Sequence, residues 1–230
     1  MRKTLSPYKF KRIAAEALRN SLRLHFDAML LFQHHSYPTA FQLSVLALEE
    51  LAKAKEVSHY YYSAITNEGR PNEAFEQEWL FMLFSHTWKQ HAYVARDMYD
   101  FSPKLVRFIQ SKELELKKQI ATYVGLDRIK KKVDVNSQIS TPQRIKNKDA
   151  KQLIALINHE YVRIFETIRL HGDYFGIPDV DNIIDPDMHQ FIFSWPHRTG
   201  LKSRRFIKLH TAQNTTNSIA LQAINTLARD

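Results

Sequence analysis

The sequence predicts an all-α protein, and three features of the chain support this fold class. Only five of the 230 residues are glycine, which is few for this length and disfavours sheets joined by tight turns. Long segments rich in Leu, Ala, Glu and Lys repeat their apolar residues with a helical period. Few segments alternate Val, Ile or Thr with polar residues. The apolar fraction of 44% is normal for a globular core.

The first half of the chain predicts three helices in succession. A helix over residues 9–34 ends at the tight joint HHSYP, and Pro38 suits the start of a second helix over 39–64. The loop TNEGRPNE follows, and a helix rich in aromatic residues is expected over 73–97.

The second half predicts three further helices and one long loop. Ser102 and Pro103 begin a helix that we expect over 104–123. The lysine-rich segment GLDRIKKKVDVNSQISTPQRIKNK has no clear periodicity and should form a long basic loop. A helix over 149–171 follows, then a segment broken by prolines, then a last helix over 203–228.

The second expected helix is apolar on nearly every side but carries two adjacent glutamates. On a helical wheel Glu50 falls inside the broader apolar stripe, whereas Glu49 falls on a thin polar seam. In the next helix, His86 lies within an apolar face with Lys89 at its margin. Because a buried carboxylate needs a cation, we expect Glu50 to contact His86, Lys89 or Lys53. The alternative is ordinary exposed ion pairs, with His86 as a satisfied core histidine.

Positive charge is concentrated in the middle of the chain. Lys and Arg number 33 against 24 Asp and Glu, and residues 104–151 hold 13 of the basic residues but only five acidic ones. Such clusters are typical of nucleic-acid binding, although many lysine-rich surfaces are simply solvated. The expected phosphate contacts are Lys130, Lys131, Lys132, Arg144, Lys146, Lys148, Arg204, Arg205 and Lys208.

Cysteine and long apolar runs are both absent from the sequence. Without cysteine there are no disulfides, thiolate zinc sites or cysteine nucleophiles, which fits a reducing compartment. The basic start of the chain has no apolar run after it, and no segment approaches the roughly 18 apolar residues of a membrane span. We expect a soluble cytoplasmic protein that does not associate with membranes.

Three motifs, in order, resemble the AbiV family of bacterial abortive-infection proteins, which belongs to the HEPN superfamily. LSVLALEELAKA resembles the EE-x-x-K signature of that family, and FSHTWKQH resembles its H-x-x-K helix. ELKKQIATYVGLD, followed by ISTPQRI and a helix, resembles its segment leading to a Pro-containing loop. The resemblance covers roughly residues 14–171. Gly125 stands where the family pattern has an aspartate, and Asp127 lies nearby.

The resemblance implies an antiparallel helical bundle, commonly dimeric, that halts host growth or translation when phage infects. RNA or the translation apparatus would be the target, a phage-encoded protein could be the trigger, and no cofactor is expected. We expect residues 1–172 to form the HEPN-like bundle. Residues 173–230 would form a connection rich in Pro and Asp and a C-terminal helix that packs on the same domain.

Many HEPN proteins are metal-independent ribonucleases with an R-x4–6-H motif, so the resemblance also implies candidate catalytic residues. Cleavage by a 2′-hydroxyl needs a base and a cation at the phosphate, which His and Arg can supply. Arg205 or Arg204 with His210, and Arg19 with His25, have this spacing. The candidate catalytic residues are Arg205, His210, Glu50, Lys53, His86 and Lys89.

Two other classes of protein remain open from the sequence. One is a non-catalytic HEPN-like interaction protein, in which the Glu, Lys and His residues form a structural network and a protein partner regulates activity. The other is a ferritin-like metal bundle, whose ligands are inward Glu and His residues. The ferritin-like class needs E-x-x-H pairs on two helices, whereas this chain has E-x-x-K.

Overall fold

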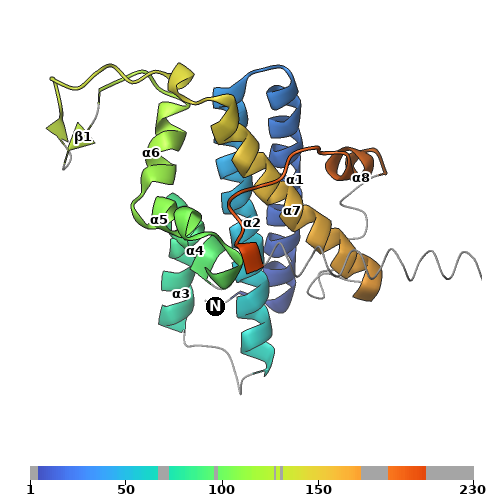
Figure 1. Ribbon diagram of the computed structural model, residues 1–230. Coiled ribbons are helices and arrows are strands. Elements are labelled where there is room, and N and C mark those ends of the chain that lie inside the picture. The colour runs from blue at the N-terminus through green and yellow to red at the C-terminus, as the bar shows by residue number, and fades with distance from the viewer. Residues whose placement is uncertain are drawn as a thin grey trace, which may run out of the picture.

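The computed structural model describes residues 5–66, 73–95, 98–126, 128–129, 132–171 and 186–205, and this part of the chain is an all-α bundle (Figure 1). The predicted fold class is therefore confirmed. The helices are α1 (Pro7–Gln33), α2 (Tyr37–Thr66), α3 (Glu73–Met82), α4 (His86–Ala95), α5 (Pro103–Gln110), α6 (Glu113–Ile120), α7 (Asn147–His171) and α8 (Pro186–Phe193). Two 3-10 turns are η1 (Met98–Asp100) and η2 (Pro142–Arg144).

Helix α2 is the central element of the bundle. It pairs with α1 as an antiparallel hairpin and also packs against α7, α4 and α6. Its side chains Phe41, Val45 and Leu48 are fully buried, as the apolar character of the segment predicts. The Ser21 hydroxyl of α1 donates to the Ala47 carbonyl at 2.6 Å, which fixes how α1 lies on α2.

Two of the expected helices are each divided into two. The expected helix over 73–97 breaks into α3 and α4, since the Ser85 hydroxyl accepts the backbone N–H of Trp88 at 3.3 Å and so begins a new helix. The expected helix over 104–123 breaks into α5 and α6 at Lys112, whose φ of 62° is left-handed and incompatible with a continuous helix.

The long basic loop between α6 and α7 extends away from the bundle, as Figure 1 shows. We name residues 123–146 the basic arm. It holds a minimal antiparallel hairpin of β1 (Arg128–Ile129) and β2 (Lys132–Val133), and a bridge between Gly125 and Ser140 closes its base. The arm is thus a projecting hairpin rather than a structureless loop.

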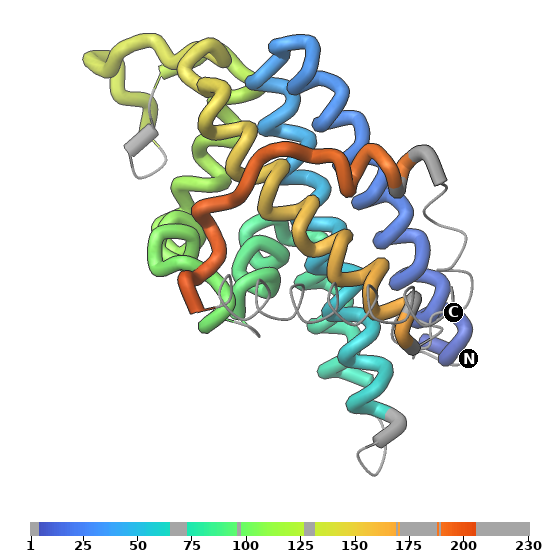
Figure 2. The backbone as a smooth tube through the Cα atoms, turned by 45° about the vertical axis from the view of Figure 1, so that its right-hand side comes forward, coloured from blue at the N-terminus to red at the C-terminus, as the bar shows by residue number. Residues whose placement is uncertain are grey.

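After α8 the chain runs back across α7, as Figure 2 shows. We name residues 194–205 the crossing segment. The Ser102 N–H donates to the Leu201 carbonyl at 2.8 Å, and the Ser203 N–H donates to the Asp100 carbonyl at 2.8 Å. Helix α8 was not expected in the Pro-broken segment, and most of the expected helix over 203–228 lies outside the described residues.

A buried ion pair ties the crossing segment to α7. Lys202 Nζ lies 2.5 Å from Glu160 Oε1, and Lys55 Nζ of α2 lies 2.6 Å from Glu160 Oε2. Burial raises the pKa of Glu160, but the charges of Lys55, Lys202 and Arg163 outweigh it and hold that pKa well below its usual range. The carboxylate therefore joins three separate segments. None of the described helices is both long and apolar enough to cross a bilayer.

Candidate functional site

Polar side chains from α2, α4 and α6 meet in a single group where these three helices pack together. We name it the charge cluster. Its members are Glu49, Glu50, Lys53, His86, Lys89, Gln90, Glu115 and Lys118. Four of these, namely Glu50, Lys53, His86 and Lys89, are candidate residues from the sequence.

Glu49 is the centre of the charge cluster and is only 1% exposed. Gln90 Nε2 and Lys118 Nζ donate to its Oε1 at 2.8 and 2.9 Å. His86 Nδ1 lies 2.6 Å from its Oε2, and Lys89 Nζ lies 3.9 Å from the same oxygen. Both carboxylate oxygens are therefore engaged by groups from α4 and α6.

Glu50 lies at the edge of the charge cluster, where its side chain is 16% exposed. Lys89 Nζ is 3.6 Å from its Oε1, and Lys53 Nζ is 3.3 Å from both oxygens. Asn20 of α1 donates to Oε2 at 3.4 Å. The predicted contact between Glu50 and a cation of the next helix is confirmed for Lys89, within one-water distance.

Glu115 and Lys118 of α6 complete the charge cluster. They pair at 2.7 Å, and Gln90 Nε2 also donates to Glu115 at 2.9 Å. Burial raises the pKa of Glu115, but the hydrogen bond and charge of Lys118, followed by Gln119 and Gln90, lower it overall. Glu115 is therefore held as a carboxylate.

The charge cluster is balanced, with three carboxylates and three ammonium groups besides the histidine. Buried charges that hydrogen-bond one another in this way hold helices in register. A general base needs a lone pair directed at substrate, and both oxygens of Glu49 already have protein partners. The inner part of the cluster is thus arranged to join α2, α4 and α6.

Only the rim of the charge cluster reaches solvent. The His86 side chain is 54% exposed. Glu50 and Lys53 line a surface groove of about 610 Å³ between α1 and α2. Lys9 and Arg12 of α1 line the same groove. The rim is therefore the part of the cluster that a ligand can contact.

Two sequence expectations about burial are wrong. Glu49, not Glu50, is the deeply buried glutamate, because the face of α2 that carries Val45 and Ala52 packs more deeply than the broader stripe. His86 does not lie in the middle of a helix face; it is the first residue of α4, where the break at Ser85 leaves its ring half exposed.

Of the candidate Arg and His pairs, only Arg19 with His25 lies wholly within the described residues. Arg205 is exposed in the last described residues, and His210 lies outside them. His25 is fully buried and bonds Asn158 Oδ1 at 3.1 Å, whereas Arg19 pairs with Glu16 at 3.0 Å on the exposed side of α1. Arg19 and His25 therefore do not share a site.

The sequence did not point to four members of the charge cluster, namely Glu49, Gln90, Glu115 and Lys118. Gln90 follows Lys89 directly, and Lys118 lies within the segment that resembles the family. Both positions could therefore have been proposed as members of the site. What the sequence could not supply is the break at Lys112, which orients α6 so that Lys118 reaches Glu49.

Metal binding was tested by the placement of the acidic residues and histidines that the structure describes. Within the described ranges, no group of three or more His, Asp or Glu side chains is placed to hold one. Glu49 and Glu50 face ammonium groups instead, which is a different set of partners from the Glu and His ligands of a ferritin-like site.

Comparison with known proteins identifies one family. The family model HEPN_AbiV, described as AbiV, matches residues 9–163, which is more than half of the chain. The matched span includes every member of the charge cluster and the whole basic arm. Neither a search of curated proteins nor a search of solved structures found a match.

Proposed function

Because this chain belongs to the AbiV family of the HEPN superfamily, which is associated with abortive-infection defence against phage, we propose that it arrests host growth or translation on infection. Its target is RNA or the translation apparatus. The basic arm is the surface that binds this target.

The exposed cations of the basic arm carry this proposal. Lys132 and Arg144 are exposed on the arm, and Lys146 and Lys148 are exposed where the arm joins α7. Figure 1 shows the backbone of the arm extending away from the bundle, which gives a phosphate backbone room to lie along it. Phosphate contacts supply most of the affinity that does not depend on base sequence.

Salt-dependent RNA binding tests this role of the arm. Binding of a single-stranded oligoribonucleotide should weaken with salt, with a log–log slope of about −0.7 for each phosphate neutralised. Replacing Lys130, Lys131 and Lys132 by Gln should flatten the slope. The matched control replaces the exposed Lys9, Lys104 and Lys112 by Gln, which removes the same charge elsewhere and should leave the slope unchanged.

Catalysis is tested separately from binding. If these residues are a ribonuclease pair, the purified variants Arg205→Ala and His210→Ala should still bind RNA. Infected cells that express either variant should show neither growth arrest nor RNA cleavage, since loss of a general base removes only stabilisation of the transition state. Full growth arrest by both variants, together with intact cellular RNA, would exclude that pair.

The closed geometry of the charge cluster favours a second candidate function, a non-catalytic protein regulated by a protein partner such as a phage-encoded trigger. A double replacement that leaves the net charge unchanged, Glu49→Gln with Lys118→Met, tests it, because it removes the central pair while Glu115, whose side chain is 17% exposed, keeps Gln90 and solvent as partners. If the folded variant still protects cells from phage, the central pair has no catalytic role. Loss of protection in a variant that is folded and dimeric contradicts the non-catalytic function.

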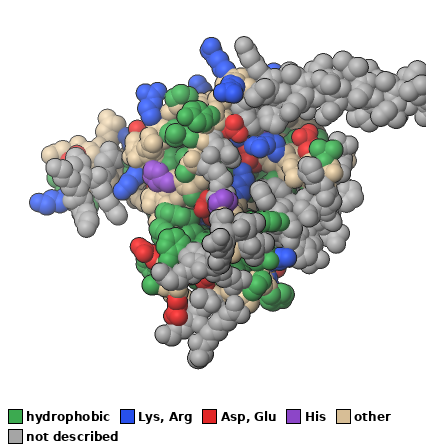
Figure 3. All heavy atoms as spheres, turned by 90° about the horizontal axis from the view of Figure 1, so that it is seen from below, with side chains coloured by type: hydrophobic (Ala, Val, Ile, Leu, Met, Phe, Trp, Pro, Cys, Tyr) green, Lys and Arg blue, Asp and Glu red, His purple; other side chains and the backbone are tan. Residues whose placement is uncertain are grey.

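A homodimer belongs to the same proposal. Exposed aromatic side chains lie at the end of α3, in the turn that follows it and in η1. Phe81 and Phe84 are each 78% exposed, and Tyr99 is 84% exposed. Figure 3 shows hydrophobic side chains gathered on this lower face of the molecule. Large exposed apolar patches are typical of protein interfaces, and a second copy of the chain is the partner we propose for this one.

A further inference from the structure

A cavity of about 200 Å³ lies at one end of the bundle and shares no residue with the charge cluster. Its walls come from the turn between α1 and α2, from the first residue of α7, and from the end of α8 with the crossing segment. The lining residues are Phe32, Gln33, His35, Tyr37, Asn147, Phe191, Ser194, Trp195, Pro196 and His197.

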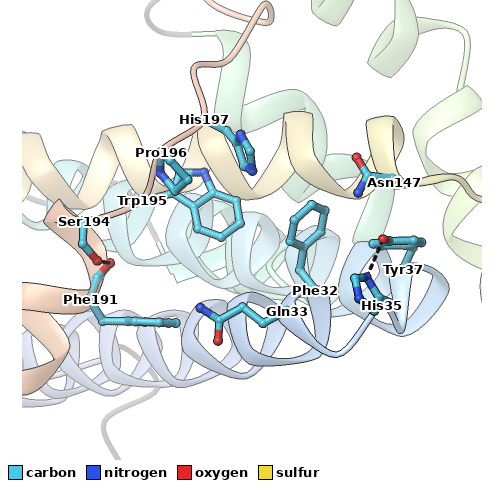
Figure 4. Close-up of a pocket in the computed structure, with 10 residues that line it drawn as sticks. All are labelled: Phe32, Gln33, His35, Tyr37, Asn147, Phe191, Ser194, Trp195, Pro196 and His197. Carbon is cyan, nitrogen blue, oxygen red and sulfur yellow. Dashed lines mark hydrogen bonds between the residues drawn. The ribbon is translucent and has the colours of Figure 1, made fainter.

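Aromatic rings form most of the cavity wall. Figure 4 shows Trp195 and Phe32 on one side of the space, with Phe191 and Gln33 below them. Phe32 packs against Trp195 edge to face, with ring centroids 5.4 Å apart, and Trp195 packs in the same way against His197 at 5.2 Å. Such walls suit a flat π-system, which stacks on aromatic rings at low cost.

One buried polar group at the cavity has no partner within the described residues, namely Nε1 of Trp195. The side-chain amides of Gln33 and Asn147 also line the cavity. An amide offers a donor pair and an acceptor together, which is the pattern that the edge of a nucleobase complements. The cavity thus combines stacking surface with hydrogen-bonding groups.

Two histidines line the cavity. His35 has a left-handed φ of 61°. Its Nδ1 lies 2.8 Å from the hydroxyl of Tyr37, another residue of the cavity wall. Burial, and then the nearby Lys151 ammonium, lower the pKa of His197. His197 is therefore neutral at pH 7 and presents an aromatic wall without a charge.

Several basic residues are close in sequence to residues that line the cavity. Lys146 and Lys148 flank Asn147 in sequence and are exposed, and the exposed Arg198 follows His197. Lys151 is close enough to His197 to act on it electrostatically. A ligand with one ring system in the cavity and a phosphate outside would therefore meet complementary charge.

The volume limits the ligand to one ring system. A protein cavity of about 150 Å³ accepts benzene, whereas drug-sized ligands occupy pockets of about 300 Å³ or more. From the aromatic walls, the unpartnered indole N–H of Trp195 and the Lys151 ammonium close to His197, we propose that this cavity binds the base of a nucleotide, with the phosphate directed to Lys151 and Arg198. The nucleotide is either free or an unpaired residue of RNA lying along the basic arm. The RNA source rests on the proposed function.

Spectra of the ¹⁵N-labelled protein test the proposal without any substitution. The chain has three tryptophans, so three indole N–H signals are expected, and Trp195→Phe assigns the one that matters. Added AMP or UMP should shift the Trp195 signal in a saturable way and leave those of Trp79 and Trp88 in place. Ribose 5-phosphate, which has the phosphate but no base, should not shift it. Absence of a shift with every nucleotide and oligoribonucleotide overturns the proposal.

Oligoribonucleotides distinguish the two sources. If octamers of rA or rU shift the Trp195 signal, the ligand is an unpaired RNA residue; if only AMP or UMP does, the ligand is a free nucleotide, and the cavity proposal stands even where RNA binding fails. If octamers bind in a salt-dependent manner without moving the Trp195 signal, and mononucleotides also fail to move it, the proposed function survives and the cavity proposal is wrong.

Two mild variants test the polar groups of the cavity. Gln33→Ala and His197→Ala remove lining groups that are exposed or half buried, so the fold should be kept. Each should weaken binding of the mononucleotide or octamer by about tenfold, on the scale of one lost base contact. Gln190→Ala is the matched control, since Gln190 is exposed on α8 and does not line the cavity. Equal binding by all three variants and the wild type would count against the cavity.

Discussion

Glu49 is a buried acid whose carboxylate is surrounded by donor groups of the protein. A carboxylate removed from water loses several kcal/mol of hydration, and here Lys118, Gln90 and His86 replace the lost water contacts. Its sequence neighbour Glu50 keeps part of its exposure and pairs with Lys53 and Lys89 near the surface. Two adjacent glutamates should therefore differ strongly in what their removal costs.

The first prediction compares the two glutamates directly. Glu49→Ala should lower the free energy of unfolding by about 3 kcal/mol, because it leaves buried ammonium and amide groups without their acceptor. Glu50→Ala should lower it by about 1 kcal/mol, since water can replace part of what is lost. Urea unfolding followed by circular dichroism at pH 7 measures both changes. Equal losses, or a larger loss for Glu50→Ala, would contradict the assignment of Glu49 as the central residue.

The second prediction concerns His25, which is fully buried between α1 and α7 and stacks on Tyr161. Burial lowers the pKa of His25 to about 4, although its hydrogen bond to Asn158 opposes this. The unfolded chain takes up the proton below about pH 6.5 and the folded protein only near pH 4, so stability falls as the pH falls between these values. The loss should be about 3 kcal/mol over this window.

Unfolding by urea at a series of pH values between 7 and 4.5 measures this dependence. The carboxyl groups of Glu115 and Glu160 have lowered pKa values and titrate below this range, so they contribute little to it. His25→Gln removes the titrating group and should flatten the curve. His34→Gln, on an exposed residue, is the control and should keep the wild-type slope. A slope that His25→Gln leaves unchanged would show that other groups are responsible.

At the scale of elements, the helices could be predicted from period and capping residues, but two breaks could not. Apolar periodicity continues across Ser85 and across Lys112, so a reading by pattern joins α3 with α4 and α5 with α6. Ser85 carries a capping hydroxyl that a reading of the sequence could weigh, whereas nothing in the type of Lys112 favours its left-handed φ. Tertiary packing imposes that conformation.

The third prediction tests the strain at Lys112. A left-handed backbone costs a residue with a Cβ roughly 1–2 kcal/mol, and glycine has no such cost. Lys112→Gly should therefore raise the free energy of unfolding by about 0.5–1 kcal/mol, after the greater freedom of glycine in the unfolded chain is counted. Gln119→Gly, inside α6, should instead lower it by about 1 kcal/mol. A loss of stability in Lys112→Gly would mean that the lysine side chain contributes more than the strain costs.

The candidate site could be predicted in part, because some of its residues follow from the helix pattern whereas others depend on how the helices pack. Glu50 was predicted from its place inside an apolar stripe, and Lys53 and Lys89 as the cations that such a carboxylate needs; the structure brings the three together. The depth of Glu49 could not be predicted, because α2 is apolar on nearly every side and a wheel does not say which side is deepest. Lys118 required knowledge of how α6 turns back toward α2, which is a property of the whole fold.

At the scale of the whole molecule, the exposed aromatic patch of Phe81, Phe84 and Tyr99 is not covered by the described residues of a single chain. Phe81 at the end of α3 and Phe84 in the turn that follows are three residues apart and are both largely exposed. Burying two such rings in an interface contributes several kcal/mol, at about 25 cal/mol for each Å² removed from water. A second copy of the chain would bury the patch on both partners at once.

The fourth prediction is therefore that the chain forms a homodimer through this patch. Light scattering at micromolar concentration should give twice the chain mass of 27.1 kDa. Phe81→Glu with Phe84→Glu should give a monomer of unchanged helix content, because both side chains are exposed and two opposed charges of one sign repel. Tyr123→Glu with Val124→Glu is the control; it adds the same charge at exposed apolar residues on the basic arm and should stay dimeric. A wild-type particle of 27.1 kDa at every concentration would remove the homodimer from the proposed function. A dimer that dissociates only in the control variant would instead place its interface on the arm, next to the cations that we propose bind RNA.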